Sequence, residues 1–153
     1  MKMFVAAAAV AAAVAVPLSA FAAKTGDNKG VNFQGTVTHT CSITVDNDGE
    51  LGVSTDFATL ASNVGAGSAG AATVAATGNT FKLYVDSPAS WSGPTSPTSV
   101  SASVSGDIST SSASASGAAV SKGEHSVSVN MSATAADFFE EGDYSATVTL
   151  RCE

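Results

Sequence analysis

The feature that most constrains the fold is a strict alternation of side chains over residues 31–45. Every second position is mostly apolar and every position between is polar; the first set is Val31, Phe33, Gly35, Val37, His39, Cys41, Ile43 and Val45. A period of two is typical of a β-strand with one buried face. The run is longer than the usual strand of about 3–10 residues. We therefore expect a bend or a division into two functional pieces at Gly35, where a side chain is missing.

Shorter segments with strand character follow along the rest of the chain. They cover residues 71–77, 80–85, 100–104, 125–132 and 144–152. Gly78-Asn79 lies between the first two and predicts a hairpin. Residues 133–141 are the one place where a helical turn is plausible, and the Ser/Ala-rich residues 109–116 fit either a poorly buried strand or a loop. About seven short strands with Ser/Thr-rich outer faces indicate an all-β, antiparallel β-sandwich.

The first 22 residues have the composition of a secretory signal peptide. Lys2 precedes an apolar run over residues 4–18, and Ala20 and Ala22 supply small residues where a signal peptidase cleaves. A membrane anchor is the alternative, but a spanning helix needs about 20 apolar residues and this run is shorter and contains Pro17. We expect an exported mature chain with no membrane span.

This interpretation divides the chain into three parts. Residues 1–22 are the signal peptide, residues 23–35 an N-terminal extension with the first strand, and residues 36–153 the β-sandwich domain.

Export also determines what the two cysteines do. Cys41 and Cys152 are the only cysteines, and an oxidising compartment favours a disulfide between them. In the chain-entropy model a loop of this length stabilises the fold by about 4.7 kcal/mol. A redox-active thiol is the less favoured reading, because there is no C-x-x-C spacing. We expect a structural disulfide between the first and last strands.

Composition argues against several functional classes. Six basic and 13 acidic residues give a net charge of −7, which disfavours nucleic-acid binding. His39 and His125 lack an accompanying activated nucleophile, so we expect no catalytic residue. Two His and two Cys are too few for a zinc cluster. Residues 46–50 resemble part of a calcium loop, but a turn is the better interpretation, so we expect no metal and no cofactor.

Residues 30–41, with the sequence GVNFQGTVTHTC, resemble the start of a chaperone–usher fimbrial subunit. The Ser/Thr/Ala/Gly-rich body and the closing segment GDYSATVTL are also similar to those pilins. The resemblance implies an incomplete immunoglobulin-like sandwich, whose groove is filled by an extended segment of a neighbouring subunit and, before that, by a periplasmic chaperone.

Strand addition of this kind gains affinity from main-chain hydrogen bonds and specificity from alternate side chains. The resemblance places the donor in residues 24–35, with Val31, Phe33 and Gly35 in the donor strand. It places the acceptor in the last strand, at Tyr144, Ala146, Val148 and Leu150.

The leading hypothesis is therefore a non-catalytic structural subunit of a bacterial surface fibre or coat, a fimbrial or adhesive assembly built by β-strand donation. Its partners are other copies or related subunits, with a periplasmic chaperone and usher in transit to the cell surface. Two alternatives stay open. One is a self-complete sandwich related to spore-coat-like secreted proteins. The other is a monomeric secreted module that binds carbohydrate through Trp91 and its acidic loops.

Two features test the leading hypothesis. Val31 and Phe33 should lie in a hydrophobic slot, either of their own chain or of a neighbour, and the two sulfurs should lie close together. The acidic residues Glu140, Glu141 and Asp143 are interpreted as a solvated loop rather than a partner contact, because short charge runs are mostly solvated.

Overall fold

The computed structural model describes residues 26–153, so the predicted signal peptide lies outside the described residues. Contacts divide the chain into two units, Met1–Gly35 and Thr36–Glu153. In the described part of the first unit, residues 26–35 form no strand. Val31 is 73% exposed and Phe33 is 92% exposed, so neither side chain lies in the hydrophobic slot that the sequence analysis expects.

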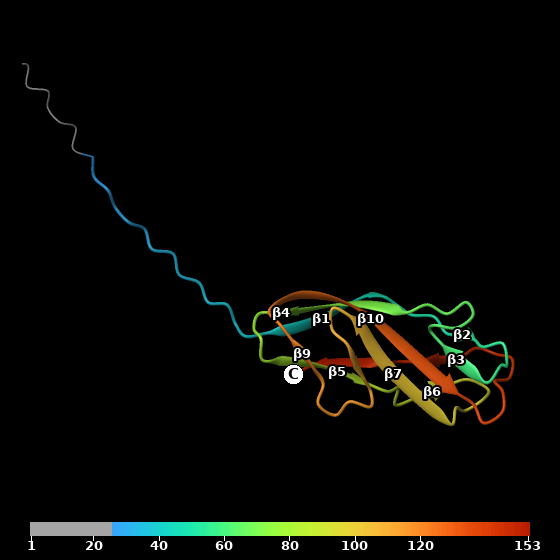
Figure 1. The fold of residues 1–153 in the computed structure, drawn as a ribbon. Helices are drawn as coiled ribbons and strands as arrows, with labels where there is room; N and C mark the ends of the chain where they lie inside the picture. The colour runs from blue at the N-terminus through green and yellow to red at the C-terminus, as the bar shows by residue number, and fades with distance from the viewer. Residues whose placement is uncertain (1–25) are drawn as a thin grey trace, which may run out of the picture. The chain divides into compact units, whose positions relative to one another are not determined.

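The second unit is the folded domain, and it is all-β: among residues 26–153 there is no helix. No segment in that range is therefore a helix able to cross a membrane. The strands, labelled where there is room in Figure 1, are β1 (Cys41–Asn47), β2 (Gly52–Val53), β3 (Thr59–Ala61), β4 (Gly70–Ala76), β5 (Phe81–Asp86), β6 (Trp91–Ser92), β7 (Ser99–Gly106), β8 (Thr110–Ser111), β9 (Ala118–Val120), β10 (Gly123–Thr134), β11 (Ser145–Ala146) and β12 (Thr149–Cys152). Several strands are only two or three residues long. So short a strand shows too little alternation to be recognised in the sequence, and about seven strands were therefore expected.

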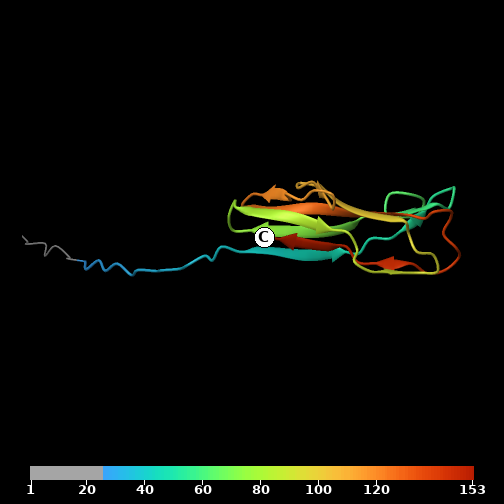
Figure 2. The ribbon, with the colours of Figure 1, turned by 90° about the horizontal axis from the view of Figure 1, so that it is seen from below.

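The strands form an antiparallel sandwich, whose layers are seen in Figure 2. The larger sheet has the order β1-β4-β10-β3-β2, with β7 on the other side of β10 and β8 beyond it. The smaller sheet has the order β12-β5-β9, and β11 and β6 form a separate pair. Every pairing between strands is antiparallel.

The core lies between the two main sheets. Its largest fully buried side chains are Val74 of β4, Leu83 of β5 and Val120 of β9. Along β4 the residues alternate between buried and half-buried, with Ala72, Val74 and Ala76 facing inward. Because many inward positions are alanine or valine, the core is thin, as the composition indicates.

The two long sides of the sandwich differ. On one side β8 pairs with β7 in the larger sheet, β9 pairs with β5 in the smaller sheet, and residues 112–117 join them. The chain itself therefore closes that side. On the other side β1 and β12 are the edge strands of their sheets, and no ladder joins these two strands. That side is open.

The predicted long first strand is wrong in extent. Of residues 31–45, those before Cys41 are not in a strand, and β1 begins at Cys41. β1 is ordered by its pairing with β4, from Cys41 opposite Ala76 onward. The alternation is present in the sequence from Val31, but residues 26–40 pair with no strand among residues 26–153.

The predicted hairpin across Gly78-Asn79 is also wrong, although both strands exist. β4 pairs with β1 and β10, whereas β5 pairs with β12 and β9. The chain thus crosses from one sheet to the other between them. The side-chain oxygen of Asn79 accepts a hydrogen bond from Lys122 N at 2.6 Å, so the loop is held by a neighbouring segment rather than by a two-residue turn.

Two expectations near the C-terminus need correction. Residues 133–134 extend β10, and residues 135–141 form no helical turn. Phe139 is instead buried as a core side chain, with Phe139 N donating to Phe57 O at 2.8 Å. The predicted last strand over residues 144–152 is divided into β11 and β12, which pair with β6 and β5 respectively.

Candidate functional site

A groove of about 720 Å³ lies along the open side of the sandwich. One wall is β1, the other is the segment from β11 to β12, and the floor comes from β4 and β10. The apolar side chains that line it are Ile43, Val45, Leu51, Ala72, Val129, Met131, Ala146, Val148 and Leu150. We call this the acceptor groove.

The acceptor groove is deep enough to reach the core. Ala72 and Met131 in its floor are 2% and 9% exposed. The side chains on its walls are less covered: Ile43 and Val148 are half-buried, and Val45 is 66% exposed. Apolar side chains with core neighbours on one side and solvent on the other are what an inserted strand would cover.

Both walls also offer backbone for pairing. β1 has one neighbour, β4, and β12 has one neighbour, β5, so one backbone edge of each strand has no strand partner among residues 26–153. Unpaired edges of this kind accept an added strand readily. The groove thus combines backbone hydrogen-bonding groups with apolar positions.

The predicted acceptor residues fall on one wall of this groove or at its continuation. Ala146, Val148 and Leu150 line it directly. Tyr144 lies farther along, in a second hollow of about 870 Å³ that shares Leu51 and Ala146 with the first. The two hollows therefore lie next to each other along the open side.

The opposite wall and the floor were missed from the sequence. The alternation predicts that Ile43 and Val45 belong to the first strand and that residues 125–132 form a strand, but it does not predict a groove between them. The alternation that identified β1 and β10 places these side chains on inward faces. What it does not give is which inward positions lie beneath an open edge.

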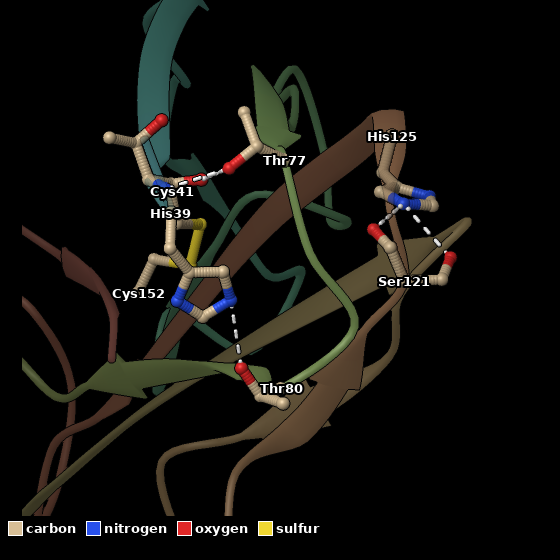
Figure 3. Close-up of a disulfide and its surroundings, with 8 residues drawn as sticks. His39, Cys41, Thr77, Thr80, Ser121, His125 and Cys152 are labelled. Carbon is tan, nitrogen blue, oxygen red and sulfur yellow. Dashed lines mark hydrogen bonds between the residues drawn. A yellow bond between two sulfur atoms is a disulfide. The ribbon is translucent and has the colours of Figure 1, made fainter. Parts of the chain in front are cut away.

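The disulfide between Cys41 and Cys152 is confirmed, with a Cα–Cα distance of 6.1 Å. It joins the start of β1 to the end of β12 (Figure 3), two residues from Ile43 and Leu150 of the acceptor groove. Disulfides are typical of exported proteins in an oxidising environment.

An aromatic cluster closes the far end of the sandwich. The rings of Trp91, Phe139 and Tyr144 lie 5.3–6.0 Å apart, centre to centre. Trp91 Nε1 donates to Thr95 O at 2.9 Å, and the Tyr144 hydroxyl donates to Glu140 O at 2.6 Å. Trp91 is half-buried, so its polar atom and much of its ring are already used inside the protein.

The two histidines occupy separate structural positions, both shown in Figure 3. The His39 ring stacks on Phe81 with 4.3 Å between ring centres, and its Nε2 lies 3.0 Å from Thr80 Oγ1. His125 Nε2 donates to Ser121 O at 2.9 Å. Among residues 26–153 no three His, Cys, Asp or Glu side chains gather to hold a metal ion.

The contacts of His39 are part of a clamp on residues 38–40. Thr40 N donates to Thr77 Oγ1 at 2.8 Å, and that hydroxyl donates to Thr38 O at 2.8 Å. Thr77 N donates to Thr40 O at 3.0 Å. The segment just before β1 is therefore attached to the loop between β4 and β5.

An ion pair fastens β12 to β5. Arg151 Nε donates to Asp86 Oδ2 at 2.7 Å, and Arg151 also contacts Glu153. The hydrogen bond from Arg151 lowers the pKa of the Asp86 carboxyl and raises the pKa of the guanidinium. The Arg151 guanidinium also lies 5.2 Å from the centre of the Tyr84 ring. These contacts hold one wall of the acceptor groove in place.

No known protein family matches the chain, and it has no significant similarity to a characterised protein or to a solved structure.

Proposed function

We propose that this chain is a non-catalytic structural subunit of a bacterial surface fibre or coat, assembled by β-strand donation. Residues 24–35 of one copy fill the acceptor groove of another. The observation that carries the proposal is a core-deep groove between two strand edges, in a chain that also carries an exposed alternating segment.

The two surfaces match in chemistry. In an extended segment, Val31 and Phe33 project from the same face about 7 Å apart, and so reach successive positions along the groove. Full burial of these two side chains stabilises the complex by about 3–6 kcal/mol before ordering costs. Main-chain hydrogen bonds to the free edge of β1 add to this.

Gly35 continues the same face of the segment without a side chain.

The clamp on residues 38–40 fixes the point at which the donated segment leaves its own domain. The donated segment leaves its own domain near the disulfide, only a few residues before β1. If it runs parallel to the β1 of the acceptor, its C-terminal end emerges at the end opposite the acceptor's disulfide. Successive domains are then arranged head to tail, and a head-to-tail contact that does not close on itself makes a filament.

The disulfide and the signal-peptide-like leader support export, with the periplasm in transit and the cell surface as destination. The resemblance to chaperone–usher subunits supports a periplasmic chaperone and an usher as transient partners. An open groove explains the need for a chaperone, since exposed edges and core side chains favour aggregation.

The experiment compares three forms of the mature chain. Phe33→Asp places a charge on the donor's apolar face, Gln34→Asp places the same charge on its polar face, and a third form lacks residues 24–35. We expect Gln34→Asp to assemble like the parent chain and the other two to remain unassembled. Electron microscopy and size-exclusion chromatography measure this. A synthetic peptide of residues 24–38 should raise the Tm of the truncated form.

Normal assembly without residues 24–35 would refute strand donation. So would a stable parent monomer whose glycan binding is lost in Trp91→Ala. That second result would support the carbohydrate-binding alternative.

A further inference from the structure

The segment just before β1 is held in place although it belongs to no strand. Residues 38–40 are exposed and lie outside every strand. Thr77, the residue after β4, contacts their backbone at three points. Its hydroxyl accepts from Thr40 N at 2.8 Å and donates to Thr38 O at 2.8 Å. Its backbone N donates to Thr40 O at 3.0 Å, so both polar backbone groups of Thr40 are fixed.

The hydroxyl of Thr77 is fully used in these contacts. A hydroxyl has one hydrogen to donate and lone pairs that accept. Of the two carbonyls within reach of Thr77 Oγ1, Thr38 O is nearer, at 2.8 Å against 3.2 Å for Thr40 O. The contacts begin one residue beyond the first pair of the ladder between β1 and β4, Cys41 opposite Ala76. They extend the attachment of the chain to β4 into residues 38–40.

The His39 ring attaches the same segment a second time. It stacks on Phe81 with 4.3 Å between ring centres, and its Nε2 lies 3.0 Å from Thr80 Oγ1 (Figure 3). Gly78 leaves room for the ring, because a Cβ at that position would lie against it. Backbone and ring are therefore both attached to one short stretch, residues 77–81.

The order of this segment contributes little to the core of the domain. Fixing an exposed segment costs backbone conformational entropy. The side chains of residues 36–40 are all exposed, so their order buries little apolar area. What the segment carries is the donor, because residues 24–35 end immediately before Thr36. The contacts are better explained by the segment that leaves the domain than by the stability of the domain itself.

We propose that Thr77 is a positioning residue for the donor segment. By fixing residues 38–40 it leaves Thr36 and Val37 as the joint between a domain and the strand that it donates. The proposal rests on the proposed function, and it adds to strand donation a cause for a stiff fibre. Thr36 and Val37 are both β-branched, which favours extended backbone in the joint.

The length of the joint decides how far successive domains can move. Two extended residues span at most about 7 Å, whereas residues 36–40 together span up to about 17 Å. A joint of two residues allows few orientations between a domain and the groove that holds its donor segment. Loss of the clamp would let the distance between neighbouring domains grow by up to about 10 Å and let the domains rotate.

NMR relaxation of the full mature chain tests the clamp. Phe33→Asp is included in every form to keep the chain monomeric. We expect backbone order parameters of residues 38–40 near about 0.85 when Thr77 is present. Thr77→Val keeps the shape of the side chain but removes the hydroxyl, and should lower them below about 0.6. Thr77→Ser keeps the hydroxyl and should restore the parent values.

Thr73→Val is the matched control. Thr73 also belongs to β4, and its hydroxyl donates to Asp46 Oδ2 on β1 at 2.8 Å. The same substitution there removes a side-chain hydrogen bond between the same two strands without touching residues 38–40. We expect it to leave their order parameters unchanged.

Electron microscopy of fibres from the mature chain without Phe33→Asp tests the positioning. Thr77→Val should lower the persistence length of the fibres at least about twofold, because a longer free linker is more flexible. Thr77→Ser and Thr73→Val should not. The synthetic peptide of residues 24–38 should raise the Tm of the form lacking residues 24–35 equally with and without Thr77→Val. That result separates positioning of the donor from damage to the groove.

The two proposals fail in different ways. Order parameters that stay the same in Thr77→Val overturn the positioning role, and so does an unchanged persistence length when the order parameters fall. In both cases strand donation stands, provided that deletion of residues 24–35 still abolishes assembly. Normal fibres without residues 24–35 show that strand donation is wrong, and the positioning role then fails with it.

Discussion

Removal of the disulfide should cost the domain much of its stability. The bond joins residues 111 positions apart and ties the first strand of one sheet to the last strand of the other. In the chain-entropy model, closing a loop of that length stabilises the fold by about 4.7 kcal/mol. Measured values are often lower, so we expect Cys41→Ala with Cys152→Ala to lower the free energy of unfolding by about 3–5 kcal/mol.

Urea unfolding followed by the fluorescence of Trp91, the single tryptophan, measures this change. With a slope of about 1.5 kcal/mol per M, the midpoint should fall by about 2–3 M. The urea midpoint is measured at two protein concentrations. A midpoint that does not depend on concentration reports unfolding alone, because association would make stability depend on concentration. Reduction of the parent protein should reproduce the shift, and Ser42→Ala, an exposed neighbour on β1, should not. A shift below about 0.5 M in the double variant would refute the loop-entropy reasoning.

Three further changes test the packing and the ion pair. Leu83→Ala removes a fully buried side chain and should lower the free energy of unfolding by about 2–5 kcal/mol; a loss under about 1 kcal/mol in urea would contradict the buried position. Gly78→Val places a Cβ against His39 Nε2, so the His39 ring must move and its NMR signals should shift. Unchanged signals would show that the loop is arranged differently. Asp86→Asn should lower the Tm at pH 7, because the carboxylate with its lowered pKa stabilises the fold above its ordinary pKa. That stabilisation is lost as the pH falls through the lowered pKa, so a Tm difference that persists at about pH 2 would contradict it.

The sequence predicts the fold class well, because period-two alternation is a local property. The inward positions of β4, β5 and β10 follow from it directly, and so does the pairing of Cys41 with Cys152 once export is inferred. Neither inference needs knowledge of which strand lies beside which.

The sequence does not predict which strand pairs with which. Gly78-Asn79 has the composition of a hairpin turn, yet β4 and β5 lie in different sheets. Partner choice depends on long-range pairing, in this case of β4 with β10 over residues 70–76. A turn motif reports local backbone preference and carries no information about that pairing.

The acceptor groove could be only half predicted for the same reason. The wall at Ala146, Val148 and Leu150 was placed from a resemblance, whereas the wall at Ile43 and Val45 depends on β1 being an edge strand. Residues 31–40 alternate as β1 does, but they have no strand partner in the part of the chain that the structure describes, so the pattern alone predicts too long a strand.

The short connection between β8 and β9 has a consequence for the shape of any assembly. If assembly proceeds by the proposed strand donation, closure of that side leaves each molecule one groove to fill and one segment to donate. A subunit with one groove and one donor segment binds two neighbours. Growth by strand donation then gives an unbranched chain of subunits. Such a polymer has an empty acceptor groove at one terminus and a free donor segment at the other, so its two termini differ chemically.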